Sequence, residues 1–178
     1  IEWRKRVGEA KAQEITTEAA GVGTRMHKYL EDLCLTGEWK EPGSNPYAQQ
    51  AHMMATTIKE RAMVHMDEVW GVEVPLYVPQ IYAGTTDLVG VYKGNPSICD
   101  FKQTNKPKKE EWVVDYFLQL TAYAIAHNEV HNTNIREGHV FMCSRDLTYQ
   151  QFDIWPDEFD DWEQEWWQRV EQYYIKHG

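Results

Sequence analysis

The stretch GTTDLVGVYKGNPSICDFK, residues 84–102, determines the fold that we expect for this chain. Two runs of apolar and β-branched residues flank the sequence KGNP, which is typical of a tight turn. This pattern predicts a β-hairpin that brings Asp87 of the first strand close to Asp100 of the second. Along a strand, positions two residues apart share a face, so Asp100 and Lys102 should project side by side.

A carboxylate next to an ammonium group suits the hydrolysis of phosphodiesters. Carboxylate oxygens are the ligands that Mg²⁺ and Mn²⁺ prefer, so Asp87 and Asp100 together could hold one or two such ions. A lysine at the position of Lys102 can orient the attacking water and offset charge on phosphorus. Taken alone, however, an Asp-x-Lys pattern in a strand is more often a surface ion pair.

Helix-forming residues dominate the part of the chain before this hairpin. We expect a helix from Glu2 to about Thr17, a break at residues 20–23, and a second helix with Thr24 as its N-cap. A third helix is expected from Tyr47 to about Met66. The first third of the chain is therefore predicted to be helical.

Strands and helices alternate in the rest of the chain. The pattern predicts an antiparallel meander of strands at 70–78, 81–92 and 97–101, a helix at 112–127, strands at 138–143 and 148–154, and a last helix from Pro156. The last helix has apolar residues at helical spacing, which we interpret as a buried stripe: Phe159, Trp162, Trp166, Val170 and Tyr173.

Length and composition limit the protein classes. A chain of 178 residues favours a single domain, with a helical portion at about 1–68 and the sheet with its flanking helices at about 69–178. It has no apolar run that could span a bilayer and no signal-peptide pattern, so we expect an intracellular protein without a membrane partner. The sequence begins with Ile1 rather than Met, so residues that precede it in a longer chain would not be seen here.

Charge and cysteine content exclude further classes. The net charge of −10 argues against a general nucleic-acid coat protein, although the basic run from Lys102 to Lys109 contains no acid. Cys34, Cys99 and Cys143 are far apart and lack Cys-x-x-Cys spacing. We expect three reduced core thiols, and neither a cysteine-ligated zinc nor an iron–sulfur cluster.

The order of several polar residues carries a family resemblance. His27 in GTRMH, Asp87 in GTTD, Asp100 and Lys102 in DFK, and Gln119 in QLTAY follow one another as in the RecB-like and Cas4-like branch of the PD-(D/E)XK nuclease superfamily. Through GTTD, DFKQT, KPK and QLTAY, the chain most resembles the mitochondrial genome maintenance exonuclease family and its phage homologues. It also resembles Cas4 nucleases, but it lacks the cysteine cluster of their iron–sulfur members.

The resemblance implies an α/β (α+β) fold with a central mixed β-sheet flanked by helices. This restriction-endonuclease-like core would follow a helical N-terminal part. The implied activity is that of a metal-dependent deoxyribonuclease, an exonuclease that hydrolyses DNA from its ends and prefers single strands. The implied location is the cytoplasm of a bacterial or phage-infected cell, or the mitochondrial matrix if the chain is eukaryotic.

The resemblance also implies roles for individual residues. The implied metal ligands are His27, Asp87, Asp100 and the carbonyl of Phe101, and the implied catalytic residues are Asp87, Asp100, Lys102 and Gln119. Glu73 and Tyr123 are additional candidates, although Glu73 is equally well explained as an outward-facing strand residue. Candidate DNA-binding residues are Arg25, Lys28, Lys106, Lys108, Lys109 and Tyr116. Many members of the superfamily have Glu at the position of Asp100, and the side chain of Asp100 has a shorter reach than Glu.

Two alternatives to this function remain open from the sequence. The same fold could carry a structure-specific endonuclease or a double-strand exonuclease. A chain of a different class would bind DNA ends without cutting them. His127 and His131 have the i, i+4 spacing of a zinc site, but Asn128 stands where zinc proteases have Glu, so we interpret both histidines as solvent-exposed polar residues.

Overall fold

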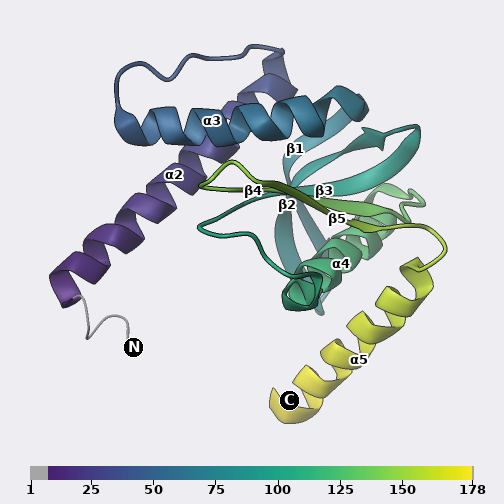
Figure 1. Ribbon diagram of the computed structural model, residues 1–178. Helices are drawn as coiled ribbons and strands as arrows, with labels where there is room; N and C mark the ends of the chain where they lie inside the picture. Colours follow the sequence, from purple (N-terminus) through teal and green to yellow (C-terminus); the bar gives the residue numbers. More distant parts are fainter. Residues whose placement is uncertain (1–7, 178) are drawn as a thin grey trace.

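The computed structural model describes residues 8–177 and contains one mixed β-sheet with helices on both faces (Figure 1). The strand order is β1-β2-β3-β4-β5. Strands β1, β2 and β3 form the expected antiparallel meander, β3 and β4 are parallel, and β4 and β5 are antiparallel. The strands are β1 (Met66–Val78), β2 (Tyr82–Tyr92), β3 (Asn95–Thr104), β4 (Gly138–Ser144) and β5 (Tyr149–Ile154).

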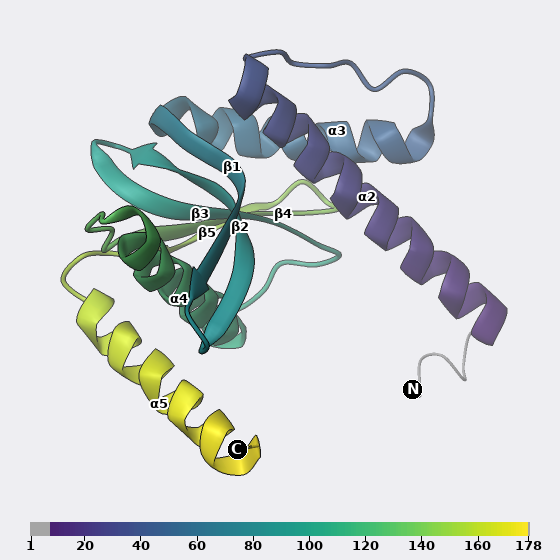
Figure 2. The same ribbon diagram turned by 180° about the vertical axis from the view of Figure 1, so that it is seen from behind.

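The helices form a layer on each side of the sheet. Helices α2 (Glu9–Thr36) and α3 (Pro46–Arg61) pack against each other on one face, and α4 (Val114–His131) covers the opposite face (Figures 1 and 2). Helix α5 (Phe159–His177) follows β5 and packs on α4. Short 3₁₀ turns lie at Met63–His65 and Glu110–Trp112. The mixed sheet flanked by helices is the α+β fold that the sequence predicted.

Alternating residues of the central strands divide the core into two layers. Cys99 and Phe101 of β3 pack with α2 and α3, whereas Ile98 packs with α4. The same alternation places Asp100 and Lys102 on the α4 side, as their spacing predicted. Cys99 and Cys143 are buried, Cys34 is half-buried, and all three are free thiols, as expected.

Helix α2 corrects the expected break at residues 20–23. The helix continues through this segment, so Thr24 lies inside it and is no N-cap. A glycine in a helix costs about 1 kcal/mol relative to alanine, which tertiary packing can outweigh. At Gly23 the reason is a close approach, because a Cβ there would meet the Gln103 side chain at 3.0 Å. The expected helix start at Glu2 lies outside the described residues.

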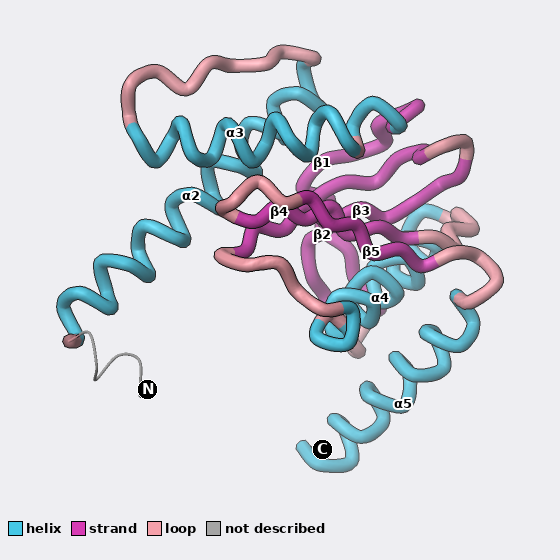
Figure 3. Tube along the Cα trace, viewed as in Figure 1, coloured by secondary structure: helices cyan, strands magenta, loops and turns pink. Residues whose placement is uncertain are grey.

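Helix α5 corrects a second expectation. The helix begins at Phe159, three residues after Pro156, and Phe159 is its one buried residue. Trp162, Trp166 and Val170 are half-buried and Tyr173 is exposed, so the expected stripe packs only partly against the body of the protein. The spacing was helical, but the C-terminal part of α5 extends away from the sheet (Figure 3). Helical periodicity predicts which face of α5 is apolar, but not how much of that face other elements cover.

Helix α4 also extends further than predicted. It ends at His131 rather than near residue 127, and its C-cap, Asn132, is left-handed with φ of 54°. His127 is buried rather than solvent-exposed, whereas His131 is exposed as expected. Among the residues that the structure describes, no helix is long and apolar enough to cross a bilayer.

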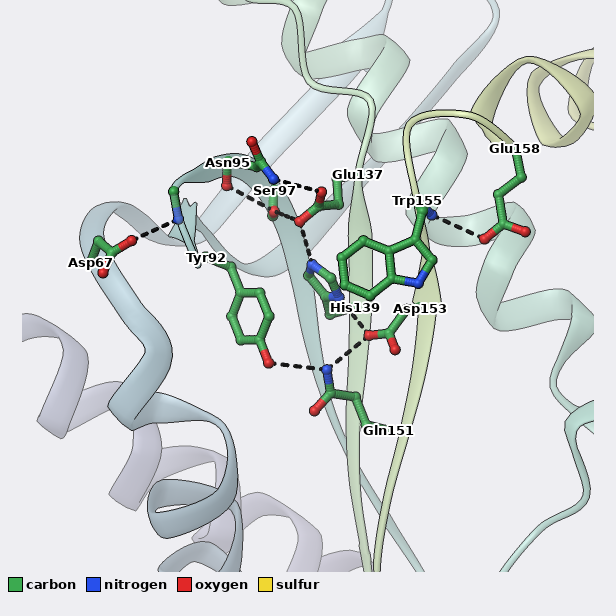
Figure 4. A network of polar contacts seen from close by, with 11 residues as sticks. Asp67, Tyr92, Asn95, Ser97, Glu137, His139, Gln151, Asp153, Trp155 and Glu158 are labelled. Carbon is green, nitrogen blue, oxygen red and sulfur yellow. Dashed lines mark hydrogen bonds and ion pairs between the residues drawn. The ribbon is translucent and has the colours of Figure 1, made fainter.

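A buried polar cluster lies where β4 begins, and its core is the trio Glu137, His139 and Asp153 (Figure 4). His139 Nε2 is 2.8 Å from Glu137 Oε2, and His139 Nδ1 is 2.6 Å from Asp153 Oδ1. Ser97 donates to Glu137, and the ring of Tyr92 lies 4.3 Å from the His139 ring, centroid to centroid. The polar atoms of this histidine are therefore satisfied inside the fold.

Candidate active site

The hairpin of β2 and β3 opens where its two acids lie. The last residue pair between these strands is Leu88 with Cys99, so Asp87 and Asp100 stand where the strands begin to separate. The Phe101 backbone would therefore lose its partner on the β2 side. Instead, the Phe101 N–H donates to Asp87 Oδ2 at 2.9 Å. The separation thus directs the Asp87 carboxylate into the gap next to Asp100.

Helix α2 brings His27 to the same gap. His27 Nε2 is 3.3 Å from Asp87 Oδ2, and the other ring nitrogen, Nδ1, is 2.9 Å from the Gly23 carbonyl oxygen. The bond to Gly23, one turn earlier on the helix, fixes the orientation of the ring. The close contact between Gly23 and Gln103 of β3 holds this part of α2 against the strand. The glycine that was expected to break the helix therefore positions the histidine.

The charges of Asp87, Asp100 and His27 interact strongly with one another. Burial raises the pKa of Asp100 to about 6, and the negative charge of Asp87 adds to this effect. Burial also opposes ionisation of Asp87 and His27, but their mutual interaction outweighs it. The pKa of Asp87 is lowered, and the pKa of His27 is raised to about 9, with help from the Gly23 and Phe101 carbonyls. The buried Asp100 and the half-buried Asp87 thus lie together, and the positive charge of His27 alone does not balance both.

Lys102 supplies part of the missing positive charge. Its Nζ is 3.4 Å from Asp100 Oδ2 and lies 5.0 Å from the centroid of the Tyr116 ring on α4. Burial disfavours the charged lysine, but Asp100 and Asp87 raise its pKa above the ordinary value. Lys102 is therefore held as a fixed cation next to Asp100, between the sheet and α4.

Gln119 and Tyr123 lie one turn apart on α4 and contact each other. Gln119 Nε2 donates to the Tyr123 hydroxyl at 3.2 Å, and Gln119 is half-buried. The Tyr123 ring packs against Gly84, where a Cβ would come within 2.8 Å of it. The charges of Asp100, Lys102 and Asp87 all act on the Tyr123 hydroxyl. The pair therefore lies at the edge of the charged group, without direct contact to it.

Glu73 stands on β1 opposite Asp87. It is the residue between Val72 and Val74, which pair with Leu88 and Thr86. Its backbone has φ of 51°, a region that residues other than glycine rarely adopt. Burial raises the pKa of Glu73, and the charge of Asp87 raises it further. The carboxylate therefore lies within electrostatic reach of Asp87.

A cleft of about 570 Å³ opens over this group. It is lined by Gly23, Thr24, His27, Lys28, Glu31, Glu73, Lys102 and Gln103. Four of these residues, Gly23, Thr24, Glu31 and Gln103, were not among the candidate site residues from sequence. Glu31 follows His27 by one helical turn, so the i, i+4 rule applied to His27 would have found it. Gln103 belongs to β3, and its buried Oε1 has no hydrogen-bond partner among the described residues.

The donor set suits a hard divalent cation. Among residues 8–177, no three His, Cys, Asp or Glu side chains form a ready metal cluster. The group nevertheless offers one imidazole, two carboxylates and the Phe101 carbonyl near His27. A cation between Asp87 and Asp100 would offset the repulsion that raises the pKa of Asp100. Oxygen-rich donors of this kind are those that Mg²⁺ and Mn²⁺ take.

The candidate DNA-binding residues divide into two groups. Arg25 donates to Asn45 at 3.3 Å and Lys28 pairs with Asp32 at 3.1 Å, both on the α2 side of the cleft. Beyond Lys102, the Lys108 Nζ lies 3.4 Å from the Tyr116 hydroxyl. Further out, Lys106 is exposed and the Lys109 Nζ lies 5.2 Å from the centroid of the exposed Trp112 ring. A strip of lysines and aromatic rings therefore leads away from Lys102.

The chain is similar to known proteins both in sequence and in structure. No family model matches the chain. The chain is 29% identical over 161 residues to mitochondrial genome maintenance exonuclease 1 of Xenopus tropicalis, which covers 81% of this chain. The aligned part spans 43% of that relative, less than half its length. A solved structure from Eubacterium rectale, named "Putative exonuclease", has a TM-score of 0.58 at 11% identity and covers 87% of this chain and 65% of that one. This structural similarity supports the α+β fold.

Proposed function

We propose that this chain is a divalent-metal-dependent DNA exonuclease of the PD-(D/E)XK superfamily, in its RecB-like and Cas4-like branch. The observation that carries the proposal is the meeting of His27 with Asp87 and of Lys102 with Asp100, from two strands and one helix, where His27 and Lys102 line a cleft. Similarity to a protein named as an exonuclease supports the same activity. DNA with a free end, preferably single-stranded, is the proposed substrate.

In this proposal each residue has a distinct task. His27, Asp87, Asp100 and the Phe101 carbonyl hold one or two Mg²⁺ or Mn²⁺ ions, which supply positive charge for the scissile phosphate and lower the pKa of bound water. Lys102, fixed next to Asp100, orients the water for attack and offsets charge on phosphorus. Gln119 orients Tyr123, and both border the substrate. No iron–sulfur cluster takes part.

The strip beyond Lys102 is the proposed path of the nucleic acid. Lys106, Lys108 and Lys109 would contact phosphates, and Tyr116 and Trp112 present rings on which bases can stack. Arg25 and Lys28 would contact phosphates from the α2 side. The proposed location is the bacterial or phage-infected cytoplasm, or the mitochondrial matrix in a eukaryote.

Purified protein tests this function directly. We expect linear single-stranded DNA to be degraded in Mg²⁺ or Mn²⁺, and circular single-stranded DNA to survive. A chelator should stop the reaction. Cleavage of circles would favour the endonuclease alternative, and faster cleavage of linear duplex than of single strands would favour the double-strand exonuclease. Binding of DNA ends without cleavage of any substrate would identify a binding subunit.

A further inference from the structure

The last turn of α4 brings two histidine rings together. His127 and His131 are four residues apart on the helix, and their ring centroids are 4.5 Å apart. His127 is only 6% exposed, whereas His131 faces solvent. The pair belongs to neither the candidate active site nor the buried cluster around His139.

A chain of hydrogen bonds fixes the protonation of His127. Asn128 Oδ1 accepts from the Ile135 N–H at 2.7 Å and Asn128 Nδ2 donates to the Ile135 carbonyl at 3.0 Å, so the amide orientation is determined. The Thr133 hydroxyl donates its single hydrogen to Asn128 Oδ1 at 2.9 Å. Thr133 Oγ1 must then accept from His127 Nδ1, 2.7 Å away. The proton is therefore on Nδ1, and Nε2 keeps its lone pair.

The surroundings hold this ring neutral and in place. The Trp70 ring of β1 stacks over His127 with 6.3 Å between centroids and 27° between planes. Burial, and then the nearby His131, lower the pKa of His127 to about 4. Among the described residues, Nε2 makes no hydrogen bond. A neutral imidazole, fixed through one nitrogen by another side chain, is the usual state of a metal-binding histidine.

We propose that His127 Nε2 and a ring nitrogen of His131 bind one Zn²⁺, Ni²⁺ or Cu²⁺ ion. An ion about 2.0–2.1 Å from a nitrogen of each ring would place the centroids roughly 4.5 to 5 Å apart, which agrees with the structure. Imidazole suits these metals, whereas Mg²⁺ and Mn²⁺ prefer oxygen. The partial negative charge at a helix C-terminus also favours a cation. Water would complete the coordination.

Such an ion would stabilise the end of α4. The two histidines belong to the last turns of α4, and the left-handed Asn132 ends the helix directly after them. Binding to the folded state alone raises its stability in proportion to the logarithm of metal concentration over Kd. The same helix carries Tyr116, Gln119 and Tyr123, so the ion would fasten the element that borders the cleft.

Titration of metal-free protein with Zn²⁺ in excess Mg²⁺ tests the site, because Mg²⁺ competes for oxygen ligands but not for paired imidazoles. Calorimetry of the wild type should show one more equivalent of bound Zn²⁺ than the His131→Gln variant. Since His131 is exposed, this variant should fold normally, which circular dichroism checks. Thr133→Val should bind roughly tenfold more weakly, as loss of an outer-shell partner does. His177→Gln, which removes an exposed histidine of α5, should bind as the wild type does.

Equal stoichiometry and affinity in His131→Gln and the wild type would overturn the proposal. Equal affinity in Thr133→Val and the wild type would overturn the assignment of Nε2 as the metal-binding nitrogen. Both results are read from binding and do not depend on nuclease activity. In Mg²⁺ alone, His131→Gln should degrade DNA at the wild-type rate if the proposed function holds.

Discussion

Among the described residues, two histidines contact carboxylates, and their surroundings differ. His139 lies between Glu137 and Asp153 in a closed cluster, where the ring itself has no exposed surface (Figure 4). His27 contacts Asp87 with one nitrogen and a backbone carbonyl with the other, and its ring lines an open cleft. A histidine thus contacts carboxylates once with its ring fully buried and once with its ring at a cleft.

The difference lies in whether the fold itself satisfies the charges. Around His139, the imidazole ring contacts two carboxylates, and Ser97, Asn95 and Gln151 complete the network. At the cleft, burial and then the charge of Asp87 raise the pKa of Asp100 to about 6 in spite of Lys102. The network around His139 satisfies its own hydrogen bonds and contributes to stability, whereas charged groups with shifted pKa values at a cleft can take a ligand. Matched substitutions in the two regions should therefore change different properties. Those at the cleft should lower activity, and those around His139 should lower stability.

The largest expected effect is on activity, from Asp100→Asn in the cleft. This change keeps the shape of the side chain but removes a charged oxygen ligand and the partner of Lys102. We expect nuclease activity to fall by at least about 10³-fold, with little change in stability. Lys102→Ala should have a similar effect while the protein still binds metal. Asp153→Asn is the matched control, since it removes a carboxylate from the closed network and should leave the turnover rate of folded protein unchanged.

Removal of the histidine from the closed network gives the next largest effect. His139→Leu leaves the Glu137 and Asp153 carboxylates without their shared partner, and breaking a buried pair costs about 3 to 5 kcal/mol. Urea denaturation should show this loss in the free energy of unfolding. The matched variant is His27→Leu, whose ring is at the cleft and contacts a single carboxylate. It should lose activity and much less stability; a reversed order would contradict the comparison.

The third prediction concerns pH. Burial opposes protonation of His139, but Asp153 and Glu137 outweigh it and raise the pKa. A histidine whose pKa is raised in the folded state stabilises the fold fully below the unfolded value of about 6.5 and loses that contribution as pH rises through the folded value. The stability difference between wild type and His139→Leu should therefore shrink above neutral pH. Thermal unfolding from pH 6 to 9 measures it, and a difference that grows with pH would contradict the assignment.

The sequence predicted most of what local patterns determine. Alternation in residues 84–102 gave the hairpin, the faces of Asp100 and Lys102, and the proximity of Asp87, because strand geometry fixes all three. The contact between Gln119 and Tyr123 follows in the same way from their i, i+4 spacing on a helix. These are short-range consequences of a single backbone conformation.

The remaining features depend on tertiary packing. The close approach at Gly23 within α2 involves Gln103, 80 residues later, so no local signal could show it. The burial of His127 depends on Trp70 and Thr133, which local spacing does not bring together. The exposure of Tyr173 on α5 depends on where the neighbouring surface ends. Sequence patterns specify which faces are apolar, but not which of them find a partner.

The smallest expected effect concerns Glu73. Its backbone strain lowers stability, whereas its carboxylate can contribute to the charged group at the cleft. Its φ of 51° is costly for a residue with a Cβ, and glycine relieves the cost. Glu73→Gly should therefore raise the free energy of unfolding by about 1 kcal/mol. If its carboxylate serves the cleft, the same variant should cut DNA more slowly, and so should Glu73→Gln, which keeps the strain. Greater stability at unchanged activity would instead make Glu73 an outward-facing strand residue, and the candidate site would then end at Asp87.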